Sequence, residues 1–175
     1  TWFREKHPRD WQYVTEDTGC EPQCLQAERV APARRKRAFW STFKFLPLQR
    51  QEALEGAAWR DVSARTCLEE ERQPAYKWVE KMPTVMACGV RSWNMARCVA
   101  ERQRSGKWRL GPMRITEAET AMGLKKDATA VVAGGEAVPV EERWRGVGNA
   151  IQLGVLKHVV VSLLLTRGYI TRDDV

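Results

Sequence analysis

The pattern of apolar and polar positions predicts two short strands in the first part of the chain. Residues 22–30 (PQCLQAERV) form one strand-like stretch, and residues 37–43 (RAFWSTF) form a second one that is rich in aromatic residues and contains a β-branched threonine. After them, residues 49–62 (QRQEALEGAAWRDV) are the only part of a charged, tryptophan-scattered segment that looks helical.

A helix is expected to begin near Thr116. Thr116 followed by Glu119 is the sequence of a capping box, in which each side chain satisfies a free backbone amide at a helix start. Gly123 would end this helix, because glycine readily adopts the left-handed conformation found after many helices. The side chains that would line its apolar face are Ile115, Ala118 and Met122.

The most apolar part of the chain lies near its end. Residues 151–165 are apolar nearly all the way round, which predicts a buried helix, and a polar turn with Gly148 and Asn149 precedes them. The run is too short to span a bilayer comfortably and contains Lys157 and His158, so no membrane is expected. Asn149 has two interpretations here: it caps the helix start, or it lines a ligand pocket.

Charge and composition narrow the class of partner. The 175 residues are 43% hydrophobic and 29% charged, as in globular proteins, with a formal net charge of +7. This balance favours a polyanionic partner, nucleic acid first and an anionic membrane surface second. A basic cluster at residues 34–37 (RRKR) stands close before Phe39 and Trp40 and suits a phosphate backbone, since guanidinium groups bind phosphates bidentately. A solvated face ahead of a core strand is the alternative.

The cysteines and histidines indicate neither a metal site nor a disulfide framework. The five cysteines include no C-x-x-C pair, and the two histidines lie far from Cys20 and Cys24 in the sequence. Free thiols in a cytosolic or nuclear protein are therefore expected. The opening residues TWFREKHPRDW show no signal peptide, so secretion is not expected, and Thr1 in place of methionine suggests a piece of a longer protein. No Ser-His-Asp set, phosphate-binding loop or HExxH motif can be assembled.

Four blocks, in order, resemble the C-terminal part of a DNA (cytosine-5)-methyltransferase, closest to the animal de novo type. "RRKRAFWSTF" is similar to the family's R-x-R block, with Arg35 and Arg37 on its two arginines. "MPTVMA" is similar to a threonine-containing segment of the recognition region, with Thr84 as the match. "RITEAETAMGL" resembles a helix that opens with Thr and Glu, and "GVGNAIQLGVLKHVVVSLL" resembles the final Gly-Asn turn and helix. Together the blocks cover most of residues 20–165.

The resemblance implies a Rossmann-like α/β fold that binds S-adenosyl-L-methionine, represented by its last strands and final helix. Residues 1–48 and 114–175 would belong to the catalytic core, and residues 49–113 would form an inserted target-recognition region. Arg35 and Arg37 would hold a flipped nucleotide and order a catalytic acid. The residues that would wall the cofactor pocket are Gly148, Asn149, Ala150 and Ile151. The residues that would face DNA are Arg34, Lys36, Thr84 and Arg91.

Two catalytic groups of that family have no counterpart in these residues. The family's nucleophile is a cysteine that follows a proline and attacks C6 of a flipped-out cytosine, and an acid in a Glu-Asn-Val block assists it. The chain contains neither Pro-Cys nor Glu-Asn-Val, and it lacks the glycine-rich cofactor loop. All three precede the R-x-R block in the family, so the chain looks truncated upstream of Thr1 and is expected to be inactive alone. The segment after Gly123, LKKDAT, also departs from the family's aromatic and proline.

The sequence therefore predicts part of an enzyme that methylates C5 of cytosine in DNA, acting in a nucleus or in the cytoplasm of a prokaryote. An alternative is a catalytically inactive methyltransferase-like module that binds DNA or a partner methyltransferase. A basic protein of unrelated function, with chance matches to the four blocks, is a third possibility.

Overall fold

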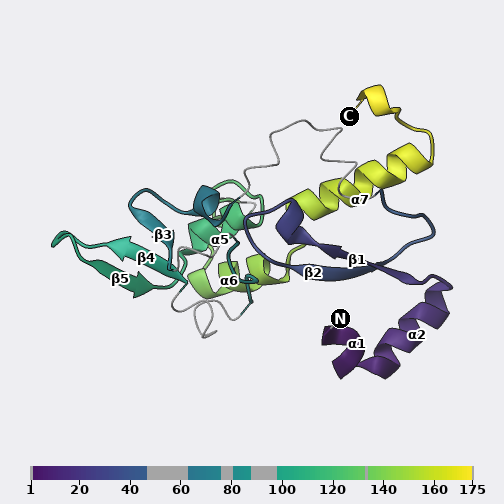
Figure 1. Ribbon diagram of the computed structural model, residues 1–175, viewed down its shortest axis with the longest axis horizontal. Helices are drawn as coiled ribbons and strands as arrows, with labels where there is room; N and C mark the ends of the chain where they lie inside the picture. Colours follow the sequence, from purple (N-terminus) through teal and green to yellow (C-terminus); the bar gives the residue numbers. More distant parts are fainter. Residues whose placement is uncertain (1, 47–62, 76–80, 88–97, 133, 175) are drawn as a thin grey trace. The chain divides into compact units, whose positions relative to one another are not determined.

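The structure is a computed structural model that describes residues 2–46, 63–75, 81–87, 98–132 and 134–174 (Figure 1). The chain divides into two compact units. The first unit comprises Thr1–Gln26, Lys36–Arg60 and Val155–Val175, and the second comprises Ala27–Arg35 and Asp61–Gly154. The helix predicted over residues 49–62 lies outside the described residues.

The first unit contains a pair of helices, a hairpin and most of the last helix. Its elements are α1 (Trp2–Lys6), α2 (Pro8–Thr18), β1 (Pro22–Gln26), β2 (Lys36–Trp40), α7 (Leu153–Thr166, from Val155 onward) and a terminal 3₁₀ turn, Arg172–Asp174. β1 and β2 are antiparallel, with Pro22 opposite Trp40. Pro8 opens α2, where its missing N–H removes no helical hydrogen bond, and Gly19 ends the helix at φ 59°.

Aromatic side chains hold α2 against the hairpin. The rings of Trp11 and Trp40 meet edge to face with centroids 5.1 Å apart, and the indole N–H of Trp40 donates to Thr15 Oγ1 at 3.0 Å. The indole N–H is satisfied inside the contact, so the pair gains apolar burial without leaving a donor unpaired.

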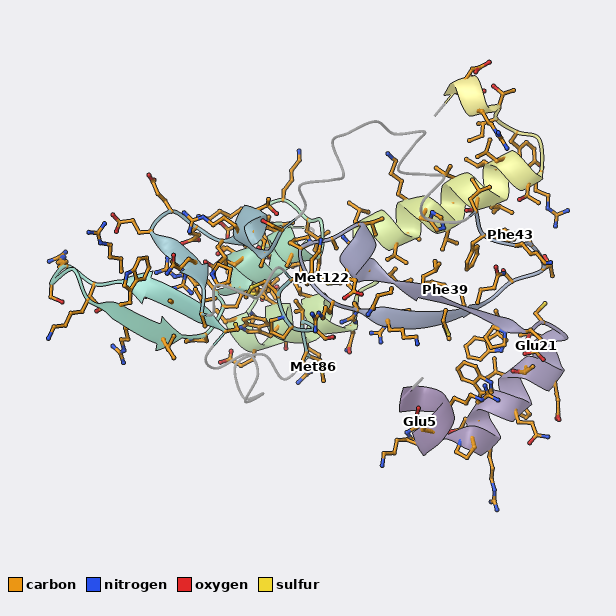
Figure 2. The ribbon with its side chains drawn as sticks, in the orientation of Figure 1. Glu5, Glu21, Phe39, Phe43, Met86 and Met122 are labelled. Carbon is orange, nitrogen blue, oxygen red and sulfur yellow. The ribbon has the colours of Figure 1, made fainter. Side chains whose placement is uncertain are left out.

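A second aromatic group lies between the hairpin and α7, within the same unit (Figure 2). The ring of Phe45 meets Phe39 at 5.9 Å, Phe43 at 5.4 Å and His158 at 6.3 Å, each edge on. The amide of Leu46 also donates to Ser162 Oγ at 3.1 Å. These contacts join α7 to the aromatic residues of the same unit through His158 and Ser162.

The second unit is built on a three-stranded antiparallel sheet in the order β3-β4-β5. Its elements are 3₁₀ turns at Ala27–Arg29 and Ala64–Cys67, β3 (Arg72–Pro74), β4 (Val99–Arg102), β5 (Trp108–Gly111), α5 (Ile115–Ala121) and α6 (Val140–Asn149). Its buried core includes Met82, Val85, Val99, Met113, Ala118, Met122, Trp144 and Val147.

The expected mixed α/β fold is confirmed, with different strand ends. The strand predicted over residues 22–30 stops at Gln26, because the next residues form a 3₁₀ turn in which the Ala27 amide donates to Arg35 O at 2.9 Å. The strand predicted over residues 37–43 is β2, which ends at Trp40. Both sheets in the described part of the chain are antiparallel.

The helix predicted near Thr116 is α5, but the expected capping box is wrong. The Arg114 amide donates to Glu117 Oε2 at 2.8 Å, so the reciprocal acid is Glu117 instead of Glu119. Thr116 lies inside the first turn and its hydroxyl donates to Glu69 Oε1. Gly123 follows the helix end at φ 81°, as predicted.

Residues Val140–Thr166 contain α6 and α7 and are long and apolar enough, by length and composition, to cross a bilayer. In the structure, 39% of their most apolar stretch is buried. A break at residues 150–152 separates the two helices, and α7 alone has 14 residues. That is shorter than the ~20 residues that span a hydrocarbon core.

Candidate functional site

Arg35 is the buried arginine of the basic cluster. It is 3% exposed, and both of its terminal nitrogens donate to backbone carbonyls. Nη1 donates to Val85 O at 2.8 Å and Nη2 to Gly148 O at 2.5 Å. These acceptors lie 50 and 113 positions further along the chain, so one guanidinium joins three distant segments. Hydrogen bonds from an ionised donor are roughly twice as strong as neutral ones.

The segment that contains Val85 is held in place by apolar burial and by backbone pairing. Met82 and Val85 are both 0% exposed. The Met82 amide donates to Pro32 O at 2.7 Å, and the Arg34 amide donates to Met82 O at 2.9 Å. Burial of these side chains therefore fixes the strand-like pairing, which places the Val85 carbonyl within reach of Arg35.

Gly148 makes a close backbone contact with the same segment. A Cβ at this position would lie 2.1 Å from Ala87 N and 2.4 Å from the carbonyl carbon of Met86. Only glycine allows this approach, which also brings the Gly148 carbonyl to Arg35. Gly148 is buried, and the space beside its Cα is filled by protein backbone.

The turn between the last two helices lies later than predicted. Gly148 and Asn149 belong to the last turn of α6, and the break comes at residues 150–152 before α7 begins at Leu153. Asn149 is therefore at a helix end, and the idea that it caps a helix start is wrong. Asn149 and Ile151 are exposed and Ala150 is half-buried, so these three side chains remain accessible to a ligand.

The helix block around α5 meets the final block at this turn. The Leu153 amide donates to Met122 O at 3.0 Å, which satisfies one of the free amides at the start of α7. Gly123 faces the same residue, since a Cβ there would lie 2.9 Å from Leu153 Cβ. The R-x-R block therefore contacts the threonine-containing segment and the final block through Arg35, and the α5 block contacts the final block through Met122 and Leu153.

Two buried acids of α5 support this arrangement, and sequence reasoning predicted the burial of neither: it did not single out Glu117 and placed Glu119 in a capping box. Glu117 is 1% exposed and its carboxylate accepts from Arg72 Nε at 2.7 Å and Nη2 at 3.2 Å. It also accepts from the backbone amides of Arg114 and Glu69. The charge is thus paired and its oxygens are saturated, as burial of a carboxylate requires.

Glu119 lies on the opposite side of α5 and is 0% exposed. It accepts from Arg143 Nη2 at 2.9 Å, from the Asp127 amide at 2.8 Å and from both the amide and the hydroxyl of Thr129. Burial acts to raise the pKa of Glu119, but the hydrogen bonds from Thr129, Arg143 and Asp127 outweigh it, so the pKa lies below its ordinary value. The sequence contains a signal for this burial. Glu117 and Glu119 are two residues apart and lie on opposite sides of a helix, so they cannot both be exposed when both sides are packed.

The residues predicted to face DNA fall in different environments. Arg34 is exposed and its Nε lies 3.4 Å from Glu28 Oε2. Lys36 and Arg37 are exposed on β2, and Lys36 lines an open cleft of about 540 Å³ in the first unit. Thr84 is half-buried in the second unit. Arg91 lies outside the described residues.

The thiols of Cys67 and Cys98 are buried. Burial raises the pKa of Cys67 to about 12, with a smaller contribution from the charge of Glu117, and burial also raises the pKa of Cys98. Cys20 and Cys24 are more accessible. Across the residues that the structure describes, no three side chains of His, Cys, Asp or Glu gather in a group that could hold a metal ion.

Neither a family model nor a curated protein matches this chain.

Proposed function

We propose that this chain is the C-terminal part of a DNA (cytosine-5)-methyltransferase. The parent enzyme transfers a methyl group from S-adenosyl-L-methionine to C5 of cytosine in DNA. In this proposal the chain supplies the last strands and the final helix of a Rossmann-like methyltransferase fold, together with an inserted target-recognition region. It acts in a nucleus, or in the cytoplasm if the source is prokaryotic.

The observation that supports the proposal is the contact of Arg35 with Val85 and Gly148. The resemblance rests on blocks that are far apart in sequence, and chance matches have no reason to meet in space. Here the R-x-R block, the threonine-containing segment and the final block share one guanidinium, and the α5 block joins them through Met122 and Leu153.

The geometry divides the proposed roles among the residues. Arg35 is a positioning residue, because its terminal nitrogens are bound to carbonyls inside the protein. Arg37 is exposed and keeps the proposed role of binding the flipped nucleotide, with Arg34, Lys36 and Thr84 proposed to face DNA. Gly148, Asn149, Ala150 and Ile151 keep their proposed role in one wall of a cofactor pocket, and the side chains of the last three are accessible. S-adenosyl-L-methionine, when bound, supplies an electrophilic methyl group.

A catalytically inactive module that binds DNA or a partner methyltransferase is the second candidate function. The absence of Pro-Cys and Glu-Asn-Val from the 175 residues favours it. The two candidates differ in the coding sequence that lies directly upstream of Thr1. A Pro-Cys loop and a Glu-Asn-Val block there support the enzyme, and a stop codon or an unrelated domain supports the module.

Transfer of labelled methyl groups tests the same point in solution. Purified residues 1–175 should transfer none to cytosine-containing DNA, since covalent catalysis needs a thiolate and an acid that the chain lacks. The protein extended by its own upstream sequence should be active, and the Arg37→Ala variant of that protein should lose activity. An extended protein that contains Pro-Cys but transfers no methyl group would contradict the proposal.

The cofactor wall is tested in the extended protein with Asn149→Asp. An amide both donates and accepts hydrogen bonds, whereas an ionised carboxylate only accepts and adds a charge near the cofactor's own carboxylate. S-adenosyl-L-methionine binding, measured by calorimetry, should weaken while the melting temperature stays close to that of the wild type. Unchanged affinity would remove Asn149 from the site.

A further inference from the structure

β5 is an edge strand of the sheet β3-β4-β5, and within the described part of the chain it pairs with β4 alone. Together the two strands form the β4–β5 hairpin, residues 99–111, whose turn extends away from α5 and α6 of the same unit (Figure 1). Every residue from 104 to 110 is exposed. One long side of the hairpin is therefore open to a further strand.

The hairpin is an ordered ribbon before any partner binds. In its turn, the Gln103 amide donates to Lys107 O at 2.8 Å and the Gly106 amide donates to Gln103 O at 2.8 Å. Gly106 has φ 79°, a conformation that glycine adopts without strain. A strand that adds to β5 therefore meets a preformed edge, which lowers the conformational entropy lost on binding.

The hydrogen bonds of β4 show which backbone groups of β5 point outward. The Arg102 amide donates to Glu71 O at 3.2 Å, on the β3 side of the sheet. Successive residues of a strand direct their N–H and C=O groups to opposite sides, so the residue before Arg102 bonds to β5, where it lies opposite Arg109. The two neighbours of Arg109, Trp108 and Leu110, therefore direct their N–H and C=O groups away from β4, to the open edge.

The side chains of β5 alternate between apolar and basic. Trp108 is 50% exposed and Leu110 is 45% exposed, and both project from one face of the ribbon. Arg109 and Lys107, the residue directly before β5, are exposed and project from the other face. A strand added to this edge would therefore meet apolar side chains on one face and cations on the other.

The hairpin is strongly positive. Its exposed cations are Arg102, Arg104, Lys107 and Arg109. Its one acid is already paired: Glu101 Oε1 accepts from Arg114 Nη2 at 2.6 Å, and Glu101 Oε2 lies 3.1 Å from Arg72 Nη1. The ion pairs found between described residues involve none of the hairpin's four exposed cations.

The charge of the hairpin decides which strand can pair with its edge. A second copy of β5 would bring like charges together, which is destabilising across a strand pair, and cations on an edge strand commonly prevent such self-association. A strand with acidic side chains is attracted, since opposite charges on neighbouring strands stabilise the pair. A phosphate chain also attracts cations, but its oxygens only accept hydrogen bonds and leave the outward carbonyls of Trp108 and Leu110 without a donor. The edge as a whole therefore fits an acidic peptide.

We propose that an extended acidic segment of a partner protein adds to β5 as a fourth strand of the sheet. Its backbone pairs with the outward N–H and C=O groups of Trp108 and Leu110. Its acidic side chains, at alternate positions, contact Lys107 and Arg109, and the apolar side chains between them cover the other face. In strand addition, main-chain hydrogen bonds give affinity and alternate side chains give specificity. This proposal does not depend on the methyltransferase function.

The test is the affinity of the whole 175-residue chain for the fluorescein-labelled peptide Glu-Val-Glu-Val-Glu-Val-Glu, measured by fluorescence anisotropy. Leu110→Pro removes one outward N–H, and proline is tolerated on the outer side of an edge strand. Leu110→Ala is the matched control, because it removes the same side chain and keeps the amide. Leu110→Pro should bind the peptide at least about tenfold more weakly than Leu110→Ala. Equal affinities of the two variants would overturn the proposal.

A charge variant leaves the backbone untouched and tests the same proposal if proline disturbs the fold. Lys107→Gln combined with Arg109→Gln should weaken peptide binding by about threefold for each charge, and so by about tenfold. The matched control is Lys125→Gln combined with Arg145→Gln, which removes the same charge from exposed positions outside the hairpin and should keep the wild-type affinity. Equal reductions of affinity in the two double variants would overturn the proposal and assign the hairpin cations to protection of the sheet edge.

Three further measurements distinguish an acidic strand from other occupants of the edge. The same peptide with lysine in place of glutamate should not bind, and equal binding of the two peptides would overturn the proposal. Leu110→Pro should leave the affinity for a 20-base-pair DNA duplex within about twofold of that of Leu110→Ala, since phosphate contacts do not require strand pairing. An equal loss of duplex and peptide binding would overturn strand addition. A dimer in sedimentation equilibrium that disappears in Leu110→Pro would assign the edge to a second copy and would also overturn it.

Discussion

The core of the second unit and its β4–β5 hairpin use arginine in opposite ways. The buried arginines, each at most 9% exposed, are Arg35, Arg72 and Arg143, and all three donate to oxygens inside the protein. The hairpin arginines are exposed on a ribbon whose one acid is already paired. The same side chain therefore stabilises the fold where acceptors surround it and stays exposed to solvent where none does.

The difference should be visible in how much a substitution lowers the free energy of unfolding. Removal of one partner of a buried ion pair leaves an uncompensated charge and costs about 3–5 kcal/mol. Changes at exposed positions without specific contacts usually stay within about 0.5 kcal/mol.

The largest effect is expected for Arg72→Met. This change leaves the carboxylate of Glu117, 1% exposed, without its charged partner, and should lower the free energy of unfolding by about 3–5 kcal/mol. Arg109→Met, the same substitution in the hairpin, should change it by less than about 0.5 kcal/mol. Urea denaturation measures both. Similar reductions of the free energy of unfolding in the two variants would contradict the difference between the buried and the hairpin arginines.

A second variant isolates the buried charge. Arg72→Met combined with Glu117→Gln should be more stable than Arg72→Met alone, because the amide is neutral and its one oxygen can still accept from one of the two backbone amides, that of Arg114 or that of Glu69. A double variant that is less stable than the single one would show that packing of Arg72, and not its charge, dominates.

Two glycines in α6 should respond with opposite signs. Gly148→Ala places a Cβ 2.1 Å from Ala87 N, so the backbone must shift, and stability should fall by about 1–3 kcal/mol. Gly146→Ala, two residues earlier, meets nothing within 4 Å and should stabilise the helix by about 0.5–1 kcal/mol. Thermal melting of both variants gives the comparison. Stabilisation by both would mean that the contact between Gly148 and the 86–87 backbone is absent in solution.

Local patterns predicted the parts of this structure that depend on neighbouring residues. The mixed α/β class, the two strands near 22 and 37, α5 and the glycine after it all follow from periodicity and turn chemistry. The last helix also appears, although its start was placed too early. Glycine at 148 suggested a turn, whereas its actual use is a close approach to a segment some 60 residues away.

Long-range pairing explains what sequence patterns could not predict. The capping acid was assigned to Glu119 because Thr116-x-x-Glu119 fits the capping motif, but Glu119 is drawn into the protein by Arg143, 24 positions away. Arg35 and Arg37 look equivalent in the sequence, and only the carbonyls of Val85 and Gly148 make the first one internal. Burial of an ionised residue depends on partners that no local window contains.

A smaller effect on the free energy of unfolding is expected from pH, through the buried carboxylate of Glu119. The pKa of Glu119 lies below its ordinary value of 4.5 in the folded state. A lowered folded-state pKa contributes stability that is fully present above the unfolded pKa and is lost as the pH falls through the folded one. The free energy of unfolding should therefore decline as the pH drops below about 5. The Glu119→Gln variant should be less stable at pH 7, and its free energy of unfolding should fall less steeply as the pH drops.

The exposed acid Glu136 provides the control for that experiment. Glu136→Gln should keep both the stability at pH 7 and the wild-type slope below pH 5, since this residue lies in the exposed loop before α6. A slope that is unchanged in Glu119→Gln but flattened in Glu136→Gln would transfer the pH dependence from the core to the surface.

The smallest effect, and the sharpest test of the boundary between core and hairpin, concerns Arg109 and Glu101. They lie opposite each other in the β4–β5 ladder, where opposite charges contribute up to about 1 kcal/mol. Glu101 is already held by Arg114 and Arg72, so its coupling to Arg109 should be below about 0.3 kcal/mol. A double-mutant cycle of Glu101→Gln and Arg109→Gln, followed by urea denaturation, measures this energy. A coupling near 1 kcal/mol would place Arg109 with the internally paired arginines.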